Sequence, residues 1–441
     1  MNLISVIIGK IIVIIGKIIN KGSSIPGAVS LKISKKVLSY FHLPKIVVAV
    51  TGSSGKGSTS SLIAEVLRKN GYTVAHNAKG ANLTAGIVTL LLENSKLNGE
   101  IKADALVFEI DERYTKEVFD VLKPKYVVIT NITRDQPPRQ GNYEMVALKI
   151  KSALKPNMHL ILNGDDPFLQ MFVMNDNVTY YGVEKNKYSY KVPKFNSLNL
   201  KYCPKCHKKL EYNYYHFEID GDYYCTNCDF RRPNIDVLAT KLDYEKELMV
   251  IDNKYTLSLQ YNILFSVYNS LAAFTLLKCL GLEEDKITES INEINGNKKI
   301  MSNYNYQDRE VTVLNNKNEN SSTFNQSLLY VSRMKDKKVI VIGWKEISRR
   351  YNFEDLSWLY DIDFELLKNL DVERVVCVGI NRYDIACRIK YSGLESKIVT
   401  FETLAQATDY IKTKTKGNIY GILNFDYVKP FNNLMMGSDE N

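Results

Sequence analysis

The segment "KIVVAVTGSSGKGST", residues 45–59, restricts the possible folds of this chain more than any other part of it. It begins with an apolar, β-branched run typical of a buried strand, and the residues that follow it have a helical pattern. The glycine- and serine-rich turn between them can hold phosphate through its backbone N–H groups and the start of the next helix. An ordinary Gly-Ser turn is the alternative, but the position between strand and helix favours a phosphate-binding loop.

The residues of this loop are the first predicted nucleotide contacts. They are Gly52, Ser53, Ser54, Gly55, Lys56, Gly57, Ser58 and Thr59. In such loops the lysine reaches the β- and γ-phosphates, and the hydroxyl that directly follows it binds Mg²⁺. Here Gly57 intervenes after Lys56. Ser58 is therefore the predicted magnesium ligand.

Polar residues also follow the next three strand-like runs, "ADALVFEI", "PKYVVITNI" and "MHLILNGDD". They are Glu109, Asp111, Asn131, Asp135, Asn163, Asp165 and Asp166. The carboxyl ends of strands in an open parallel sheet face the ligand crevice, and magnesium prefers one or two carboxylates beside phosphate oxygens. Glu109 is thus the second predicted magnesium ligand, with a solvated strand end as the alternative. Further predicted cofactor contacts are Asn131, Asp135, Asn163 and Asp165.

Alternating strands and helices predict an α/β protein of two or three domains. We expect an amphipathic helical segment over residues 1–44 and a doubly wound ATP-binding domain over residues 45–296. A polar stretch after Gly296 marks a boundary, and the runs "EVTVLN", "KKVIVIG", "RVVCVGI" and "KIVTF" predict a smaller Rossmann-like domain over residues 297–441.

Two CxxC pairs interrupt this α/β pattern. Cys203, Cys206, Cys225 and Cys228 provide four thiolates, the ligand set of a tetrahedral zinc site, within an insertion of about residues 198–234. Without a secretion signal, such spacing favours a metal over disulfides and indicates a reducing compartment. All four positions are filled by protein, so the metal is predicted to be structural, although ribbons of this kind often read nucleic acids.

The N-terminus, "MNLISVIIGKIIVIIGKIINKG", is strongly apolar. A signal peptide would carry its charge before the apolar run and a small-residue cleavage site after it, and neither is clear. We expect a helix with Lys10 and Lys17 on one stripe, which either packs on the protein or lies on a membrane surface; a spanning helix is a further alternative. The net charge of +9 is spread over many lysines and does not by itself indicate nucleic-acid binding.

The order of motifs, TGSSGKGST, GANLTAGI, FEIDE, NITRDQ, LNGDDP and YNSLAA, resembles the Mur ligase superfamily of ATP-dependent carboxylate–amine ligases. The four-cysteine segment, "SSIPGAVSLKIS", "DLSWLYDIDFE" and "INRYDIACRIKYSGL" resemble the MurT family within it, so the resemblance spans nearly the whole chain. It implies a Mur ligase-type central P-loop domain with an inserted zinc ribbon, and it adds Asn269 of YNSLAA to the nucleotide contacts.

The resemblance also implies a function. MurT is the synthetase subunit of lipid II isoglutaminyl synthase: ATP converts the D-glutamyl α-carboxylate of the stem peptide to an acyl phosphate, and ammonia then gives D-isoglutamine. The implied cofactors are ATP, Mg²⁺ and Zn²⁺. The implied partners are a GatD-like glutaminase subunit, in a heterodimer, and a lipid-linked peptidoglycan precursor, with no nucleic acid. The implied location is the cytoplasm, including the inner face of the cell membrane.

The chain lacks the residues for making ammonia itself. A class I glutaminase needs a Cys nucleophile and a His base. In this chain no histidine follows His216, and no nucleophile elbow surrounds Cys377 or Cys387. The resemblance implies that an Asp of "FEDLSWLYDIDFE" orients the catalytic His of the partner. Asp355 is the first candidate and Asp361 the second, with a helix cap or a surface carboxylate as the alternative.

Some positions depart from the family pattern. Pro137-Pro138 replaces a usual Leu-Asp pair, "GNKK" replaces an Arg-containing segment, and "GWKEISRRYNFE" precedes "DLSW". These departures leave open a scaffold that has lost turnover. Two further alternatives are a ligase of the same scaffold that adds an amino acid rather than ammonia, and a zinc-ribbon ATPase that binds nucleic acid, which the +9 charge, the Tyr-rich ribbon and the loop support.

Overall fold

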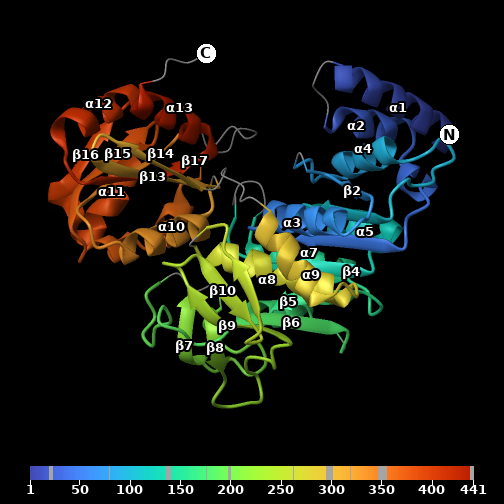
Figure 1. Ribbon diagram of the computed structural model, residues 1–441, viewed down its shortest axis with the longest axis horizontal. Coiled ribbons are helices and arrows are strands. Elements are labelled where there is room, and N and C mark those ends of the chain that lie inside the picture. The colour runs from blue at the N-terminus through green and yellow to red at the C-terminus, as the bar shows by residue number, and fades with distance from the viewer. Residues whose placement is uncertain are drawn as a thin grey trace.

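The computed structural model describes residues 1–18, 23–78, 80–135, 141–174, 176–196, 200–261, 263–294, 301–317, 319–345 and 355–437. Pro137-Pro138, the "GNKK" segment and the predicted boundary at residue 296 lie outside these residues. So does most of the segment before "DLSW". Figure 1 shows an N-terminal helical layer, a large central sheet, an insertion below it and a separate C-terminal α/β unit.

The central sheet has nine strands in the order β11-β10-β9-β6-β5-β4-β1-β3-β2. The seven strands from β9 to β2 are parallel, and the antiparallel hairpin β10–β11 extends one edge. Their bounds are β1 Ile46–Thr51, β2 Val74–His76, β3 Ala105–Glu109, β4 Tyr126–Ile129, β5 His159–Asn163, β6 Val178–Val183, β9 Val237–Asp243, β10 Leu248–Ile251 and β11 Tyr255–Ser258. The predicted doubly wound α/β arrangement is thus confirmed.

Helices cover both faces of this sheet, because alternate residues of its strands point to opposite sides. In β1, Val48 and Val50 pack with helices α3 (Lys56–Lys69) and α8 (Leu264–Cys279), beside α9 (Glu284–Glu293). Val47 and Ala49 pack in the opposite layer. That layer contains α4 (Thr84–Asn94), α5 (Thr115–Leu122) and α7 (Tyr143–Ala153). The apolar run of β1 is therefore buried on both faces.

The C-terminal unit has its own six-stranded sheet in the order β12-β13-β17-β14-β15-β16, with only β12 antiparallel to its neighbour. Its strands are β12 Met301–Tyr306, β13 Arg309–Asn316, β14 Lys338–Trp344, β15 Val372–Gly379, β16 Ile398–Phe401 and β17 Asn418–Asn424. Its helices are α10 Ser321–Arg333, α11 Arg382–Ile389, α12 Leu404–Lys414 and α13 Phe425–Met436. Two cores, one on each face, confirm the predicted Rossmann-like unit.

Two smaller parts complete the fold. At the N-terminus, α1 (Asn2–Ile18) and α2 (Ile25–Ile33) pack on α4. After β6, the two-stranded sheet β7 (Glu211–Phe217) and β8 (Asp220–Tyr224) forms the insertion that holds the CxxC pairs. Among the described residues, no helix is both long and apolar enough to cross a bilayer.

Candidate functional site

The phosphate-binding loop joins β1 to α3, and its shape depends on two glycines. Gly52 and Gly55 have φ angles of +127° and +83°, a region that residues with a side chain rarely adopt. A Cβ at Gly55 would lie 2.3 Å from Asn269 Oδ1, so the predicted contact Asn269 of α8 lies against the loop. Helix α3 begins at Lys56, and its first N–H groups therefore adjoin the loop.

Gly57, which separates Lys56 from Ser58, leaves room for a carboxylate. A Cβ at this position would lie 3.0 Å from Glu109 Oε2. Glu109 ends β3, the neighbour of β1, and burial raises its pKa while Lys56 and Lys317 oppose the rise. Ser58 and Glu109 line the same cavity, so the structure brings together the two predicted magnesium ligands.

Asn131 holds the loop rather than facing away from it. Its Oδ1 accepts a hydrogen bond from Ser54 N at 2.9 Å, and its Nδ2 donates to Ser54 O at 3.1 Å. Its own carbonyl accepts from Ser53 N at 2.8 Å. Thr130 Oγ1 adds a bond to Ser54 O at 2.6 Å. The end of β4 therefore fixes the backbone that is predicted to cradle phosphate.

Lys56 is buried and paired with Glu112, a residue that the sequence did not single out. Its Nζ donates to Glu112 Oε1 at 2.6 Å and also to Gly52 O. Burial lowers the pKa of Lys56, but the charges of Glu112, Asp135 and Glu109 outweigh burial, and the pKa is raised. Glu112 is fully buried, and its Oε2 has no hydrogen-bond partner within the described part of the chain.

Asp111 is engaged locally. It accepts from Arg113 N at the start of the 3₁₀ turn Glu112–Tyr114, and it forms an ion pair with the Arg113 guanidinium at 2.8 Å. In the motif FEIDE, Glu109 and Asp111 both line the larger cavity, Asp111 also caps the turn, and Glu112 pairs with Lys56. Glu112 was detectable only as the third acid of this motif, because nothing local distinguishes it from a solvated charge.

A cavity of about 340 Å³ adjoins the loop and lies between the two α/β units. One wall is the loop with Ser58, Glu109 and Asn269. The opposite wall comes from the C-terminal unit and includes Asn316, Lys317 and Gln326. Tyr261, Ile263, Phe265 and Leu314 supply an apolar part. A cavity with a phosphate loop at one end and apolar and amide side chains at the other suits a nucleotide.

Lys317 and Asp135 join the two units at the edge of this cavity. Lys317 Nζ donates to Ser53 O at 2.9 Å and pairs with Asp135 Oδ2. Asn320 Nδ2 donates to Asp135 Oδ1 at 3.0 Å. The predicted contact Asp135 therefore holds a cation from the other unit next to the loop. Sequence reasoning missed Lys317 because it stands alone in a polar stretch of a different domain.

The structure does not bring Asn163 and Asp165 to the 340 Å³ cavity. Asn163 lines a second cavity of about 30 Å³ on the other side of Ser54 and Gly55. Asp165 is fully buried and pairs with Arg232 at 2.6 Å, while Tyr268 OH and Val183 N donate to its Oδ2 at 2.9 and 2.8 Å. With these partners, Asp165 ties α8 and the end of the insertion to the sheet.

Three further carboxylates line the small cavity: Asp166, Glu218 and Asp220. Glu218 lies at the turn of the β7–β8 hairpin, with φ of +36°. Burial raises the pKa of Asp166 to about 7 and of Glu218 to about 8, and it raises the pKa of Asp220 well above its usual range. We call these three residues the hairpin group. Glu109, Glu112 and Asp135, which face Lys56 and Lys317, form the cation-paired group.

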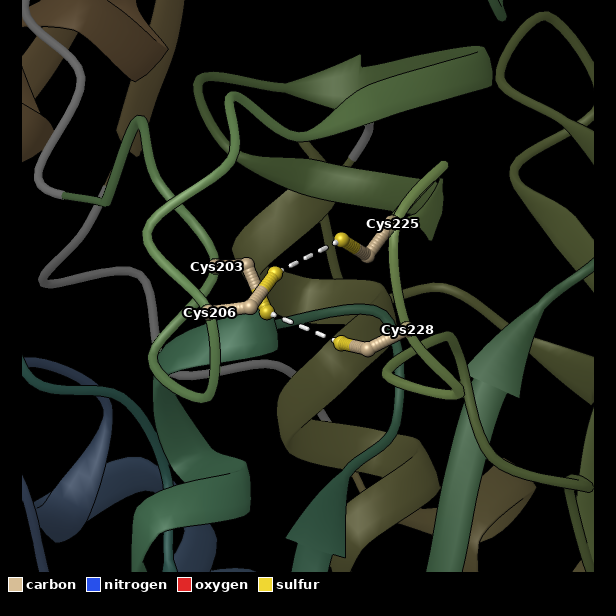
Figure 2. Close-up of side chains that lie close together, drawn as sticks. All are labelled: Cys203, Cys206, Cys225 and Cys228. Atoms are coloured by element: carbon tan, nitrogen blue, oxygen red, sulfur yellow. Dashed lines mark hydrogen bonds between the residues drawn. The ribbon is translucent and has the colours of Figure 1, made fainter.

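The four predicted metal ligands lie together (Figure 2), with their sulfur atoms all within 4.8 Å of one another. Cys203 Sγ is 3.5 Å from Cys228 Sγ, and Cys206 Sγ is 3.4 Å from Cys225 Sγ. Four thiolates bound at about 2.3 Å in a tetrahedron have comparable separations. Lys205 N and Asn227 N each donate to a cysteine sulfur at 3.4 Å. The set therefore fits a tetrahedral zinc ion.

The candidate aspartates for the partner differ in their contacts. Asp361 Oδ2 accepts from Arg134 Nη1 of the central domain at 2.8 Å, whereas Asp355 Oδ1 accepts a local hydrogen bond from Ser357 N at 2.9 Å. Burial alone raises the pKa of Asp355, but the Ser357 bonds and Arg134 outweigh burial and lower the pKa. Asp355 thus stays ionised and is less engaged than Asp361.

Comparison with known proteins shows the family to which this chain belongs. Residues 50–277 match the family model for the Mur ligase middle domain, and residues 318–427 match that for the MurT ligase C-terminal domain. The first match covers more than half of the chain, which therefore belongs to the Mur ligase family. The loop, Glu109 and the larger cavity's central wall all lie within the first match, and Lys317 immediately precedes the second.

Within this family the chain is similar to MurT subunits along its length. It is 29% identical over 419 residues to the lipid II isoglutaminyl synthase subunit MurT of Staphylococcus aureus strain N315, covering 93% of this chain and 92% of that one. It is 27% identical over 427 residues to the MurT of Streptococcus pneumoniae, covering 95% and 93%. The suspected resemblance to MurT is therefore confirmed.

Solved structures agree on the fold. A pseudomurein peptide ligase type C from Methanothermus fervidus has a TM-score of 0.71 at 20% identity, covering 91% of this chain and 80% of that one. MurF from Acinetobacter baumannii has a TM-score of 0.63 at 16% identity, covering 89% and 76%. The predicted Mur ligase fold with a C-terminal α/β domain is confirmed by these similarities.

Proposed function

We propose that this chain is the synthetase subunit of a lipid II isoglutaminyl synthase. It would use ATP to activate the D-glutamyl α-carboxylate of the lipid-linked stem peptide, and ammonia would then form the amide. One observation carries the proposal: the Mur ligase loop and the MurT-type C-terminal domain form opposite walls of one cavity. The relatives that match 93% and 95% of this chain are named as subunits of that synthase.

The chemistry suits the cavity. A carboxylate oxygen attacks the γ-phosphorus of ATP, ADP leaves, and ammonia displaces phosphate from the resulting acyl phosphate while losing a proton. This transfer depends on positioning and on cations around the phosphoryl group rather than on covalent catalysis by the protein. Lys56 and Lys317 are the cations at the loop. In the nucleotide complex we expect Lys56 to leave Glu112 and donate to phosphate oxygens.

The remaining assignments are part of this proposal. Ser58 and Glu109 would hold Mg²⁺, which would neutralise phosphate charge, and the four cysteines would hold a structural Zn²⁺. The units would be residues 1–44, 45–296 with a ribbon at about 198–234, and 297–441. A lipid-linked substrate would place the enzyme at the inner face of the cell membrane. Ile219 at the hairpin turn of the ribbon is buried in the central core, and this anchoring supports a structural role for the ribbon.

The test is coexpression with a GatD-type glutaminase, followed by glutamine-dependent amidation of lipid II, with mass spectrometry to locate the amide. We expect the two proteins to copurify and, without added ammonium, to form the amide only when ATP and glutamine are both present. Ammonium supplied directly should replace glutamine and the partner. Transfer of an amino acid with none of ammonia would instead establish the amino-acid ligase alternative.

Asp355 should serve the partner. Asp355→Asn should reduce glutamine-dependent amidation by about 10²-fold or more, because the partner histidine loses the carboxylate that orients it. Amidation with ammonium should be unchanged, since the ATP site is intact. Asp361→Asn is the matched variant, and it should act mainly by loosening the contact with Arg134. If only Asp361→Asn lost glutamine-dependent activity, the order of the two candidates would be reversed.

A further inference from the structure

The N-terminal helix α1 exposes apolar side chains on its outer face. Ile4, Ile7, Ile11, Ile14, Ile15 and Ile18 are between 39% and 77% exposed, and Met1 and Leu3 are exposed beside them. The spacing of three and four residues places them in one stripe along the helix. Soluble surfaces rarely carry contiguous apolar patches of this kind without a binding role. We call these six isoleucines the outer stripe.

The inner face of α1 explains why the outer stripe cannot turn inward. Its buried residues include Ser5 and Gly9, which have little or no side chain. Ser5 of α1 and Ser30 of α2 each donate a hydroxyl hydrogen bond to the carbonyl of the other. A Cβ at Gly9 would lie 2.3 Å from Ser30 Oγ, so the two helices are in close contact. Lys10 Nζ donates to Leu92 O and Ser95 O, both at 2.6 Å, at the end of α4. The lysine that interrupts the apolar sequence is thus turned into the protein, and the helix is fixed with its isoleucines outward.

The charge around α1 is of one sign. Residues 1–44 contain six lysines and no Asp or Glu, and the first acidic residue of the chain is Glu65. Lys17 is exposed at one end of α1. At the other end, Ser34 Oγ donates to Asn2 Oδ1 at 2.5 Å, which brings the exposed Lys35 and Lys36 near the start of the helix. The outer stripe is therefore flanked by cations at both ends.

We infer that α1 lies in the plane of an anionic membrane, with the outer stripe among the acyl chains and the lysines at the head groups. An apolar helix face edged by lysines is the pattern of interfacial helices, whose binding combines apolar burial with attraction to anionic lipid. A second copy of the chain is a poorer occupant, because pairing two stripes would bring two acid-free, lysine-rich segments together. This inference rests on the proposed function and extends it, because the outer stripe and its lysines would hold the enzyme at the membrane that contains its lipid-linked substrate.

The test is cosedimentation of the full chain with vesicles, without ATP, glutamine, partner or substrate. We expect binding to vesicles containing phosphatidylglycerol and at least tenfold weaker binding to pure phosphatidylcholine. Ile7→Ser with Ile14→Ser should weaken binding to the anionic vesicles by at least tenfold. The matched control is Val192→Ser with Ile380→Ser, which removes exposed apolar side chains elsewhere and should bind like the wild type.

Charge is tested in the same assay. Lys17→Gln with Lys36→Gln should weaken binding roughly tenfold at low salt, whereas the exposed pair Lys241→Gln with Lys335→Gln should not. Unchanged melting temperatures would exclude misfolding of the variants. Absence of vesicle binding, or equal binding by the outer-stripe variant, overturns the inference. So does a lipid-free dimer that the outer-stripe variant abolishes. Amidation of a lipid-free stem peptide tests the proposed function separately, since it requires no membrane.

Discussion

The two groups of carboxylates beside the phosphate-binding loop differ in how they are accommodated. The cation-paired group faces Lys56 and Lys317, whereas no Lys or Arg forms an ion pair with the hairpin group among the described residues. Burial raises the pKa of Asp166 and Glu218 to about 7 and 8, so that near neutral pH Glu218 is mostly protonated and Asp166 exchanges between its neutral and charged forms. A buried acid without a cation avoids the cost of charge by keeping its proton.

This difference indicates that the cation-paired group belongs to a ligand site, whereas the hairpin group has a structural role. In the cation-paired group, the carboxylates hold the Lys56 and Lys317 ammonium groups at the loop, where a phosphate of the proposed nucleotide could replace Glu112 as the partner of Lys56. In the hairpin group, Glu218 accepts from Asn325 Nδ2 at 2.9 Å, and it thereby ties the insertion to α10 of the C-terminal unit. Both groups thus hold the domains together, one through charge and the other through neutral hydrogen bonds.

The largest effect is expected at Lys56. Lys56→Ala should lower ATP-dependent turnover by about 10²–10³-fold, because a preorganised cation at the phosphoryl group is lost. It should also lower the free energy of unfolding by about 3–5 kcal/mol, because Glu112 would remain buried without a partner. Turnover and thermal unfolding measure the two effects.

A double variant separates the effect of Lys56→Ala on turnover from its effect on stability. Lys56→Ala with Glu112→Gln should recover most of the lost stability while turnover stays low, since the unpaired charge is gone but the cation is not restored. Lys69→Ala is the matched control, because Lys69 lies on the same helix in an exposed ion pair. Recovery of turnover in the double variant would show that Lys56 acts only on folding.

A smaller loss of turnover is expected at Lys317, about tenfold, because Lys56 remains at the loop. Lys317→Ala should leave folding of each domain intact, since Asn320 still donates to Asp135. Single-turnover kinetics at saturating ATP separate phosphoryl transfer from ATP binding, and the exposed Lys335→Ala is the control. If only the ATP affinity changed, Lys317 would hold the C-terminal unit against the loop without taking part in phosphoryl transfer.

Removing one of the four proposed zinc ligands should loosen the insertion that carries the hairpin group. Cys206→Ser should abolish zinc binding and make amide exchange in residues 200–232 about tenfold faster or more, because the hairpin has too small a core of its own. Exchange should also rise at α10, where Ser322 and Asn325 contact Glu218. Cys387→Ser, at an exposed cysteine, is the control. Unchanged exchange at α10 would remove the proposed link between ribbon and C-terminal unit.

Much of the fold follows from local patterns. The predicted runs at residues 46–50, 105–109, 126–129 and 159–163 are strands, because β-branched residues buried on both faces of a parallel sheet form continuous apolar segments. The sequence reasoning did not find β2, which has only three residues, or β17, "NIYGILN", at the centre of the C-terminal sheet. A glycine and a tyrosine in that run weaken its apolar pattern.

The site was predictable only where it is local. The loop and the four cysteines are short motifs whose residue types and spacing predict phosphate binding and metal binding. Lys317 reaches the loop from the C-terminal unit and Glu218 lies in the insertion, and their roles depend on how these parts pack against the central sheet. Asn131 and Asp165 were recognised as strand-end polar residues, but their bonds to loop backbone and to Arg232 are properties of the folded chain.

The smallest effect concerns the protonation of Glu218. A folded-state pKa of about 8, above the usual value of 4.5, means that the native state binds a proton that the unfolded chain releases. The stability that this group contributes is therefore complete below about pH 4.5 and is lost as the pH rises toward 8, by at most about 1.4 kcal/mol per pH unit. Besides burial, Asp363 and Asp361 raise this pKa, while Asn325 and Ser322 lower it.

Glu218→Gln should remove that part of the pH dependence, because an amide keeps the shape of the protonated acid and the acceptor for Asn325. Chemical denaturation from pH 5 to pH 8 should show little difference at the acid end and a more stable variant at pH 8. Asp166 and Asp220 leave a residual slope, since their pKa values are also raised. Glu211→Gln, at an exposed position of the same hairpin, should change nothing. If Glu218→Gln destabilised the protein at pH 8, Glu218 would be charged in the native state, and the contrast between the two carboxylate groups would fail.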